Sequence, residues 1–289
     1  KKTFRHQIYT EYKGTRKETP ADLLSQFPIL KTVLNAMNIK LIELDGIEAD
    51  DIIGTLTKKF PVENIIVTGD RDCLQLINQN TWVMFTKKGI SETLNYNSES
   101  IKELLNIEPY QVIEEKALMG DASDNIPGVS GIGGKTAQML LEKYNDIDNL
   151  YKNIDEITGK LKENLVNNKE IAYLSKTLAT IKTDVDISCN LADFEYSFPF
   201  NNKVLELFKK YQFNSLLKRP ELFDNSVTEE QRTDMPNKKL KTNEVKDLAG
   251  VTNLLADANK CNEIYIVFEN KLSLYFNNTE YNFNFEISL

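Results

Sequence analysis

The sequence predicts an α/β fold followed by a helical region. Over residues 20–106, short apolar runs typical of strands alternate with segments of helical periodicity, which indicates a parallel, twisted sheet with flanking helices. From residue 109 to residue 223 the periodicity is almost wholly helical. Residues 224–243 hold almost no aliphatic side chains and predict a linker. We therefore expect domains over 1–108, 109–223 and 244–289.

The individual elements follow from local periodicity. Pro20 begins a helix to about residue 37, whose predicted core stripe is Leu23, Leu24, Phe27, Leu30 and Leu34. Strands are expected at 40–44, 64–68 and 81–85, and helices at 109–120, 135–144, 147–153, 161–180 and 202–211. After the linker we expect a helix near 244–258 and strands at 263–268, 271–276 and 281–286.

Composition excludes several classes of protein. The 289 residues carry 35 Lys and Arg against 43 Asp and Glu, and this charge of −8 hides local basic patches. A single histidine argues against a Ser-His-Asp triad. Three separate cysteines without a CxxC pair argue against a zinc site or disulfides and suit a reducing cytoplasm. Without a signal peptide or an apolar run of ~18 residues, we expect a soluble, cytoplasmic protein with no membrane partner.

Two groups of acidic residues stand at the ends of predicted elements. Glu48, Asp50 and Asp51 begin a predicted helix, and Asp70 and Asp72 follow the buried strand at 64–68. Acids at a helix start complement the dipole by ~0.3–1 kcal/mol each, and Asp72 would also suit a helix N-cap. Three acids within four residues exceed that need, because like charges ~4 Å apart repel by ~4 kcal/mol at an effective dielectric of about 20. The pattern therefore favours a divalent cation at the carboxyl end of a strand.

The stretch 120–137, GDASDNIPGVSGIGGKTA, sets two more acids before a glycine-rich turn that opens a helix. Asp121 and Asp124 are suited to Mg²⁺, and backbone N–H groups at such a turn are suited to phosphate. A capped surface loop explains the glycines alone equally well, but it does not explain two acids ahead of a basic turn. Lys135 is either a phosphate ligand or a solvated lysine of the first helical turn.

Residues 1–19 form a basic, aromatic segment. Helical spacing would place on one face Arg5, Tyr9, Tyr12, Lys13 and Arg16. Such a face could neutralise phosphates and stack a base, although a solvated amphipathic helix is an equally good interpretation. Because Gly14 costs a helix ~1 kcal/mol relative to alanine, we expect full ordering only on a ligand.

These motifs resemble the 5′-nuclease domain of bacterial DNA polymerase I and the related flap endonucleases. TFRHQIYTEYKGTR is similar to the start of the family's helical arch, EADD and the DxD at Asp70 and Asp72 are similar to its metal motifs, and 120–137 is similar to its last metal motif and helix-hairpin-helix. The resemblance implies a PIN-like 5′-nuclease sheet, whose first strands are missing here, and a helix-hairpin-helix DNA-binding region.

The resemblance also implies roles for individual residues. The metal ligands would be Glu48, Asp50, Asp51, Asp70, Asp72, Asp121 and Asp124. The catalytic basic residues at the scissile phosphate would be Lys13, Arg16 and Arg5. The DNA-binding residues would be Tyr12, Gly128, Gly131, Gly133, Lys135 and Thr136.

The implied cofactors are two or more Mg²⁺ or Mn²⁺ ions, with a monovalent cation at the hairpin. The implied substrates are branched or flapped double-stranded DNA with a 5′ single strand and RNA-primed DNA. The implied activity is a structure-selective 5′–3′ exonuclease or flap endonuclease that works in DNA replication and repair. We expect a monomer.

Two departures from the family bear on activity. The family has two further aspartates before the arch, and this chain begins just after the second would occur. We therefore expect an N-terminally truncated piece of a longer polymerase with weak metal binding and little nuclease activity. Residues 244–289 resemble the start of a ribonuclease-H-like 3′–5′ exonuclease domain, but Glu269 stands where an active domain has an Asp-x-Glu pair, so no proofreading is expected.

Three rival functions remain open from sequence. A non-catalytic, structure-selective DNA-binding module would bind DNA through the hairpin and the arch, and its acids would be residual and without a catalytic role. A ribonuclease of the PIN type would share the acidic α/β site but has no use for the hairpin at 120–137. A phosphatase of small molecules would leave both the arch and the hairpin unexplained.

Overall fold

The computed structural model describes residues 2–89, 91–223, 241–245, 248–260, 265–268, 272–276 and 279–283. The chain divides into two compact units, of which the first comprises Lys1–Asn35 with Ile39–Glu195 and the second comprises Ala36–Asn38 with Tyr196–Leu289. Each unit is described by itself.

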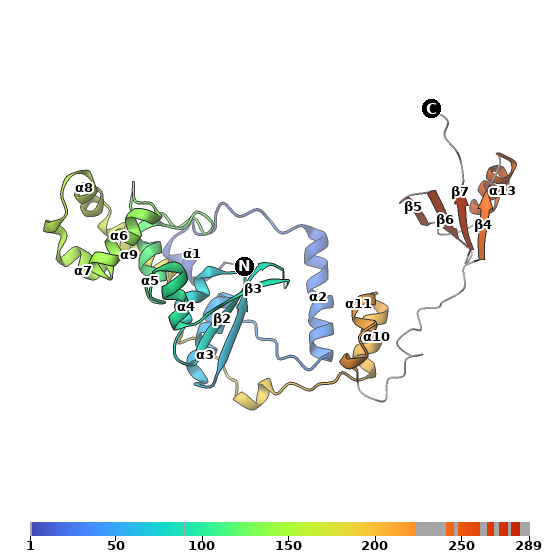
Figure 1. Cartoon of the computed structure of the whole chain (residues 1–289), viewed down its shortest axis with the longest axis horizontal. Helices are drawn as coiled ribbons and strands as arrows, with labels where there is room; N and C mark the ends of the chain where they lie inside the picture. Colours follow the sequence, from blue (N-terminus) through green and yellow to red (C-terminus); the bar gives the residue numbers. More distant parts are fainter. Residues whose placement is uncertain are drawn as a thin grey trace. The chain divides into compact units, whose positions relative to one another are not determined.

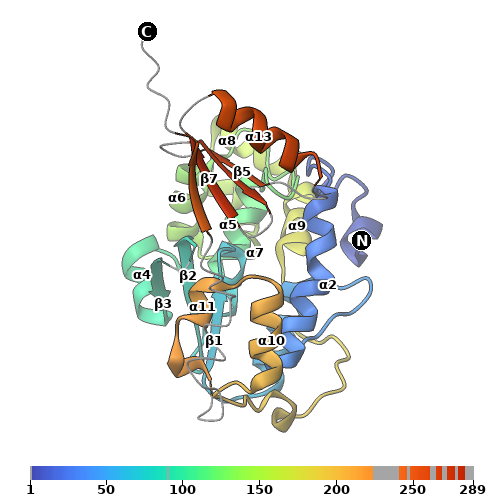
Figure 2. The ribbon, with the colours of Figure 1, turned by 90° about the vertical axis from the view of Figure 1, so that its right-hand side faces the viewer.

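The first unit contains a three-stranded sheet of β1 (Asn64–Thr68), β2 (Thr81–Lys88) and β3 (Glu92–Tyr96), in that spatial order (Figures 1 and 2). The β1–β2 pair is parallel as predicted, whereas β2 and β3 are antiparallel. The strand β3 was not predicted, and it adds an antiparallel edge to the predicted parallel pair. Three residues separate β2 from β3, too few for the crossover that a parallel pair requires.

Helices cover this sheet through a buried apolar core. They are α3 (Ala49–Lys59), α4 (Ser98–Leu105) and the 3₁₀ helix η1 (Arg71–Leu76). Ile66, Leu74, Val83 and Ile101 lie in the shared cluster, and Cys73 is buried beside them as a small apolar residue. The core therefore fixes η1, which follows the carboxyl end of β1, has Asp70 as its N-cap and carries Asp72 in its first turn.

Two expectations for residues 20–44 need correction. The predicted helix is present as α2 (Ala21–Ala36), but its stripe does not form a core, because Leu23, Leu24, Phe27 and Leu30 are 44–52% exposed. Val33 is instead the buried residue of α2. The segment 40–44 forms no strand, since no described strand supplies it with ladder hydrogen bonds.

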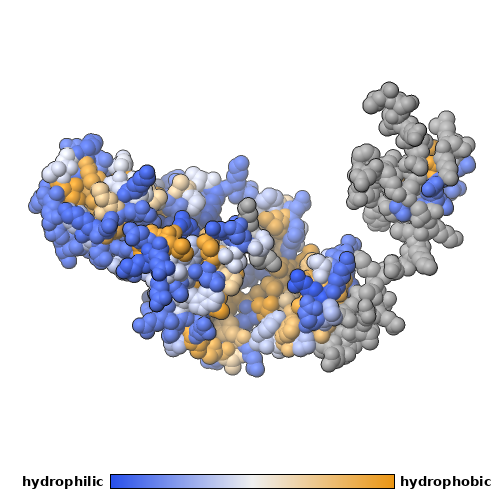
Figure 3. Space-filling model, viewed as in Figure 1, coloured by the Kyte–Doolittle hydropathy of each residue, from blue (hydrophilic) through white to orange (hydrophobic). Residues whose placement is uncertain are grey.

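The helical region, residues 109–180, confirms most predicted helices. It contains α5 (Gln111–Met119), α6 (Gly134–Tyr144), α7 (Ile147–Lys152), η2 (Ile154–Glu156), α8 (Gly159–Asn167) and α9 (Lys169–Ala179). The helix expected over 161–180 is broken at Asn168 into α8 and α9. The surface over α7 and α8 is mostly hydrophilic (Figure 3).

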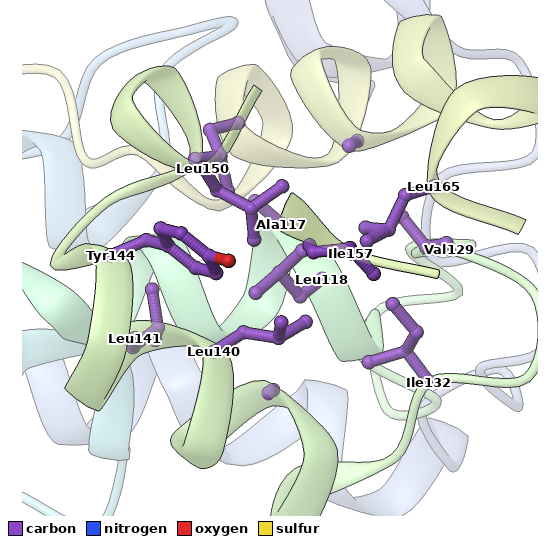
Figure 4. Close-up of a cluster of buried hydrophobic side chains, with 13 residues drawn as sticks. Ala117, Leu118, Val129, Ile132, Leu140, Leu141, Tyr144, Leu150, Ile157 and Leu165 are labelled. Carbon is purple, nitrogen blue, oxygen red and sulfur yellow. The ribbon is translucent and has the colours of Figure 1, made fainter. Parts of the chain in front are cut away.

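One continuous apolar core holds these helices together. In Figure 4 the side chains of Leu118 from α5, Leu140 from α6, Leu150 from α7 and Leu165 from α8 converge on it. Each of these four leucines is at most 2% exposed. Burying such a side chain is worth ~1.5–3 kcal/mol, so the region has a full hydrophobic core of its own.

The N-terminal segment is not one long helix. Helix α1 spans only Phe4–Ile8, and Tyr9 already has an extended backbone. Residues 10–15 form turns, with Lys13 in the left-handed region at φ 55°. A left-handed residue interrupts the helical hydrogen-bond ladder, so the predicted single face over residues 1–19 does not form.

The second unit contains α10 (Asn202–Lys210), α11 (Asn214–Leu217) and η4 (Pro220–Leu222), packed around Phe200, Phe208 and Phe223. A second sheet has the order β4 (Lys241–Val245), β7 (Thr279–Phe283), β6 (Leu272–Phe276), β5 (Tyr265–Phe268), with α13 at Leu248–Ala258. The predicted linker therefore reaches too far, because Lys241–Val245 is a strand. Glu269 and residues 224–240 lie outside the described residues. Among the described helices, none has the length and apolar character needed to cross a membrane.

Candidate metal centre and nucleic-acid interface

A cleft of about 480 Å³ in the first unit brings together acids from two separate predicted motifs. Asp70 and Asp72 enter it from the loop after β1 and from η1, while Asp121 and Asp124 enter it from the turn after α5. Arg16 and Lys116 are the basic residues among its lining that contact these acids. We call this the acidic cleft.

A second acidic group lies at the start of α3. Ligand atoms of Glu48, Asp50 and Asp51 lie within 4.8 Å of one another. Glu48 is the helix N-cap, so the capping position and the first turn, where the dipole favours negative charge, supply all three carboxylates. Burial, with Asp51 and then Glu48 nearby, raises the pKa of Asp50 to about 6.

Arg5 is the structural clamp of this group and is 1% exposed. Its Nη1 donates to Glu48 Oε2 and Asp51 Oδ2, and its Nη2 donates to Asp51 Oδ1, each at 2.8 Å. Its remaining donors reach the carbonyl oxygens of Leu178 and Thr180 at 2.8 and 2.7 Å. Burial alone would lower the pKa of Arg5, but Asp51 and Glu48 raise it. Because every side of the guanidinium is engaged inside the protein, the predicted phosphate contact of Arg5 does not fit this arrangement.

Asp51 is likewise engaged on both oxygens and is fully buried. Its Oδ1 accepts from Arg5 and from the backbone N–H of Lys182, and its Oδ2 accepts from Arg5 and from the backbone N–H of Glu48. A carboxylate has about four lone-pair positions, so these four bonds use its capacity. Asp51 is thus placed to orient Glu48 and Asp50.

Tyr12 and Lys13 connect the two acidic groups. The Tyr12 hydroxyl lies 3.0 Å from Glu48 Oε2 and 3.1 Å from Asp124 Oδ2. Lys13 Nζ lies 2.5 Å from Glu48 Oε1 and 3.5 Å from Asp124 Oδ2. Burial, followed by the charges of Glu48 and Asp124, raises the pKa of Tyr12. At 3% exposure Tyr12 has no free ring face for a base, so the predicted stacking role does not fit this structure.

Arg16 lies at the edge of the acidic cleft. Its Nη2 contacts Asp124 Oδ1 at 2.5 Å, while 54% of its side chain is exposed. Asp124 therefore faces Tyr12, Lys13 and Arg16 at once. Asp124 thereby joins the Glu48 group and the acidic cleft into one continuous group of acids and cations, which we call the acidic seam. The predicted acids therefore do not point into separate regions of solvent.

Within the cleft, Lys116 of α5 bridges Asp72 and Asp121, with its Nζ 2.5 Å from Asp121 Oδ2. Burial tends to raise the pKa of Asp121, but hydrogen bonds from Lys116 and Ser123 lower it to about 2. The pKa of Asp72 is raised, because burial outweighs Lys116. Sequence reasoning did not single out Lys116. The sequence did hold an indication of its role, because Lys116 lies five residues before Asp121 on a predicted helix, next to the apolar pair Ala117 and Leu118.

The donor set suits a hard divalent cation. The candidate ligands are carboxylate oxygens. Among them, Asp50 and Asp70 have no ion-pair partner in the described part of the chain. Asp70 caps η1 through a hydrogen bond from the N–H of Asp72, which corrects the alternative that Asp72 is the cap. Carboxylates left without a cation in a crowded acidic seam fit ions such as Mg²⁺.

The glycine-rich turn divides into a buried part and an exposed part. The N–H of Gly128 donates inward to Ser175 Oγ at 3.0 Å, and a Cβ at Gly128 would lie 2.2 Å from the backbone nitrogen of Gly120. The predicted DNA-binding role of Gly128 does not fit this arrangement, because its N–H is engaged inside the protein. Gly133 is the N-cap of α6, and Lys135 on its first turn is exposed. The first N–H groups of α6 have no partner within the helix, which is the arrangement that binds anions.

Comparison with models of known protein families identifies the family of this chain. Residues 1–106 match the family model "5′-3′ exonuclease, N-terminal resolvase-like domain", and residues 107–202 match "5′-3′ exonuclease, C-terminal SAM fold". The chain belongs to the 5′–3′ exonuclease family. Together the two models cover the sheet, the acidic seam and the helical region.

Relatives of this 5′–3′ exonuclease chain include DNA polymerase I of Bacillus caldotenax, 45% identical over 76% of the chain, and that of Bacillus subtilis, 43% identical over 84%. The aligned parts are 26% and 28% of those proteins, so the chain spans about a quarter of their length. The predicted resemblance to the nuclease part of bacterial DNA polymerase I is confirmed.

Solved structures give the same answer for the fold. The chain is similar to bacteriophage T5 5′-exonuclease with bound zinc ions, with TM-score 0.54 and 26% identity over 63% of this chain and 72% of that one. It is also similar to a T5 flap endonuclease complex with DNA and metal ions, with TM-score 0.53 and 25% identity over 63% and 71%. The predicted 5′-nuclease fold is therefore confirmed, and the family is one of metal-dependent nucleases.

Proposed function

We propose that this chain is a structure-selective 5′-nuclease that hydrolyses phosphodiester bonds in branched DNA carrying a 5′ single strand. The observation that carries the proposal is the convergence of acids from three sequence motifs on the acidic seam, with basic side chains at its edge. The family supports this reading, and the T5 flap endonuclease complex was described with DNA and metal ions.

The ligands we assign to Mg²⁺ or Mn²⁺ are Glu48, Asp50, Asp70, Asp72, Asp121 and Asp124. Bound divalent ions, two or more in such a site, would lower the pKa of a water and stabilise the leaving oxygen. Asp51 and Arg5 then act as positioning residues, because their mutual hydrogen bonds fix the start of α3. Tyr12 has a similar task between Glu48 and Asp124.

Lys13 and Arg16 are the basic residues we assign to the scissile phosphate. Their side chains are 18% and 54% exposed, so both have access to solvent while they contact the acids of the seam. Preorganised cations of this kind stabilise the charge that develops on a phosphoryl group.

The duplex part of the substrate is assigned to the exposed turn before α6. Gly131, Gly133, Lys135 and Thr136 would contact the sugar-phosphate backbone through N–H groups, the Lys135 ammonium and the Thr136 hydroxyl, with a monovalent cation at the same turn. Such contacts hold a duplex without reading its bases.

For the parent protein we propose the setting of its relatives. A DNA polymerase I that carries this nuclease would remove RNA-primed or displaced 5′ strands during replication and repair, as a monomer in the bacterial cytoplasm. The segment 244–289 stays a prediction of an inactive 3′–5′ exonuclease-like domain.

The test compares a labelled 5′-flap duplex with a plain duplex and with single-stranded RNA. We expect the chain to bind the flap most tightly in Ca²⁺, and to cleave it in Mg²⁺ but not in EDTA, at the low rate that the sequence predicts. Asp70→Asn and Asp121→Asn should lose cleavage by at least about 100-fold and keep flap binding, as expected when groups of the catalytic centre are removed. Asp148→Asn is the control, because Asp148 is an acid of α7 outside the seam.

Different outcomes separate the rival functions. Flap binding without any metal-dependent cleavage, unchanged in the two Asn variants, would favour a non-catalytic DNA-binding module. Preferred cleavage of single-stranded RNA would favour a ribonuclease. Equal affinity for flap and plain duplex would contradict structure selectivity.

A further inference from the structure

Lys116 occupies an unusual position for a lysine. It lies in the last turn of α5, yet its ammonium group reaches into the acidic cleft and contacts Asp72 and Asp121. Only 16% of its side chain is exposed. The two carboxylates come from different parts of the fold, η1 after the sheet and the turn after α5, so Lys116 ties these parts together at the cleft.

The ammonium takes an oxygen that a metal ion would need. Asp121 Oδ1 already accepts the backbone N–H and the hydroxyl of Ser123, at 2.8 and 2.7 Å. Lys116 contacts the other oxygen, Oδ2. An ammonium group has three donors and no acceptor, so it can replace a cation between carboxylates but cannot itself become a metal ligand.

We propose that Lys116 is a built-in counter-ion that keeps Asp72 and Asp121 together and competes with a divalent ion for them. This inference rests on the proposed metal-dependent function and adds a positioning residue to it. Without Lys116 the two acids would repel each other, and an arriving cation would gain both carboxylates without displacing an ammonium group. The lysine thus lowers metal affinity while it preserves the geometry of the site.

The helical region offers a matched lysine outside the seam. Lys176 of α9 also bridges two acids, with its Nζ 2.7 Å from Glu114 Oε1 and 3.3 Å from Asp148 Oδ2. Its side chain is 26% exposed, close to the value for Lys116. Neither of its acids lines the acidic cleft. Lys176→Met therefore removes the same kind of bridge without touching an assigned metal ligand.

The experiment measures Mn²⁺ affinity by calorimetry and by the electron paramagnetic resonance signal of free Mn²⁺, with thermal unfolding in EDTA and in Mn²⁺. We expect Lys116→Met to unfold at a lower temperature in EDTA, to bind Mn²⁺ about tenfold more tightly, and to gain more stability from Mn²⁺ than the wild type does. Lys116→Gln should shift in the same direction and serves if the Met variant does not fold. Lys116→Arg, which keeps the charge, should bind Mn²⁺ as the wild type does.

The remaining outcomes overturn the inference. Weaker Mn²⁺ binding by Lys116→Met and Lys116→Gln would show that Lys116 only supports the ligands. Unchanged Mn²⁺ affinity would show that it does not compete. A change of equal size in Lys176→Met would show a general charge effect. If the wild type binds no Mn²⁺ at all, the proposed function fails first, whereas wild-type binding with an unchanged variant overturns the role of Lys116 alone.

Discussion

The apolar core of the helical region and the acidic seam share helix α5 but are held together by opposite kinds of interaction. Around Leu118, apolar side chains from five helices are buried against one another, and no ligand is needed to complete that core. Around Glu48 and Asp124, buried and half-buried acids are held by cations from the N-terminal segment and α5. The comparison shows that apolar burial alone holds the helical core, whereas the seam depends on ion pairs and leaves Asp50 and Asp70 without a cation in the described part of the chain.

The largest expected effect comes from breaking the ionic side of this comparison. Arg5→Met should lower the free energy of unfolding by about 3–5 kcal/mol, because it leaves the buried carboxylate of Asp51 without its cation. Urea denaturation measures this. In the double variant Arg5→Met, Asp51→Leu most of the loss should be recovered, since the orphaned charge is then gone. A loss below about 1 kcal/mol in the single variant would show that Arg5 is not a structural clamp.

Truncating a side chain of the apolar core should lower the free energy of unfolding by a similar amount, for a different reason. Leu118→Ala removes a fully buried side chain from the helical core and should cost about 2–5 kcal/mol, in part through the cavity that remains. The same urea experiment with and without Mn²⁺ separates the two regions. Mn²⁺ should stabilise the wild type and the Leu118→Ala variant equally, because Leu118 lies outside the seam. An altered Mn²⁺ response would mean that the core also shapes the metal centre.

Much of this arrangement could be predicted from the sequence, for a definite reason. Runs such as NIIVT and the acids at 48–51 and 70–72 are local patterns, and a strand followed by acids places carboxylates at a sheet edge. Burial of charge is not local. The basic spacing at Arg5 is the same whether the guanidinium faces solvent or Asp51, and that choice depends on carbonyl groups at 178 and 180. The roles of Arg5, Tyr12 and Lys116 therefore required the tertiary structure.

A smaller effect tests the turn that joins the two regions. Gly128→Ser places a side chain at φ 66° and against the backbone of Gly120, so we expect a loss of about 1–3 kcal/mol from strain. Gly133→Ser is the matched change, because nothing lies within 4 Å of its Cβ position and serine is a preferred N-cap residue. Thermal unfolding of both variants should show a loss only for Gly128→Ser. Equal losses would contradict the division of the turn into a buried and an exposed part.

The smallest expected effect is on the free energy of unfolding when an exposed apolar side chain of α2 is truncated. Leu24 of α2 is 52% exposed, so Leu24→Ala should change the free energy of unfolding by no more than about 0.5 kcal/mol. Val33 of the same helix is 4% exposed, and Val33→Ala should cost more than about 1 kcal/mol, at ~0.8 kcal/mol for each buried methylene. Helix propensity opposes this difference, because replacing the β-branched valine by alanine favours the helix more than replacing leucine does. If Leu24→Ala proves as costly as Val33→Ala in urea denaturation, the apolar face of α2 is covered in solution, and the sequence-based prediction of a core stripe regains its support.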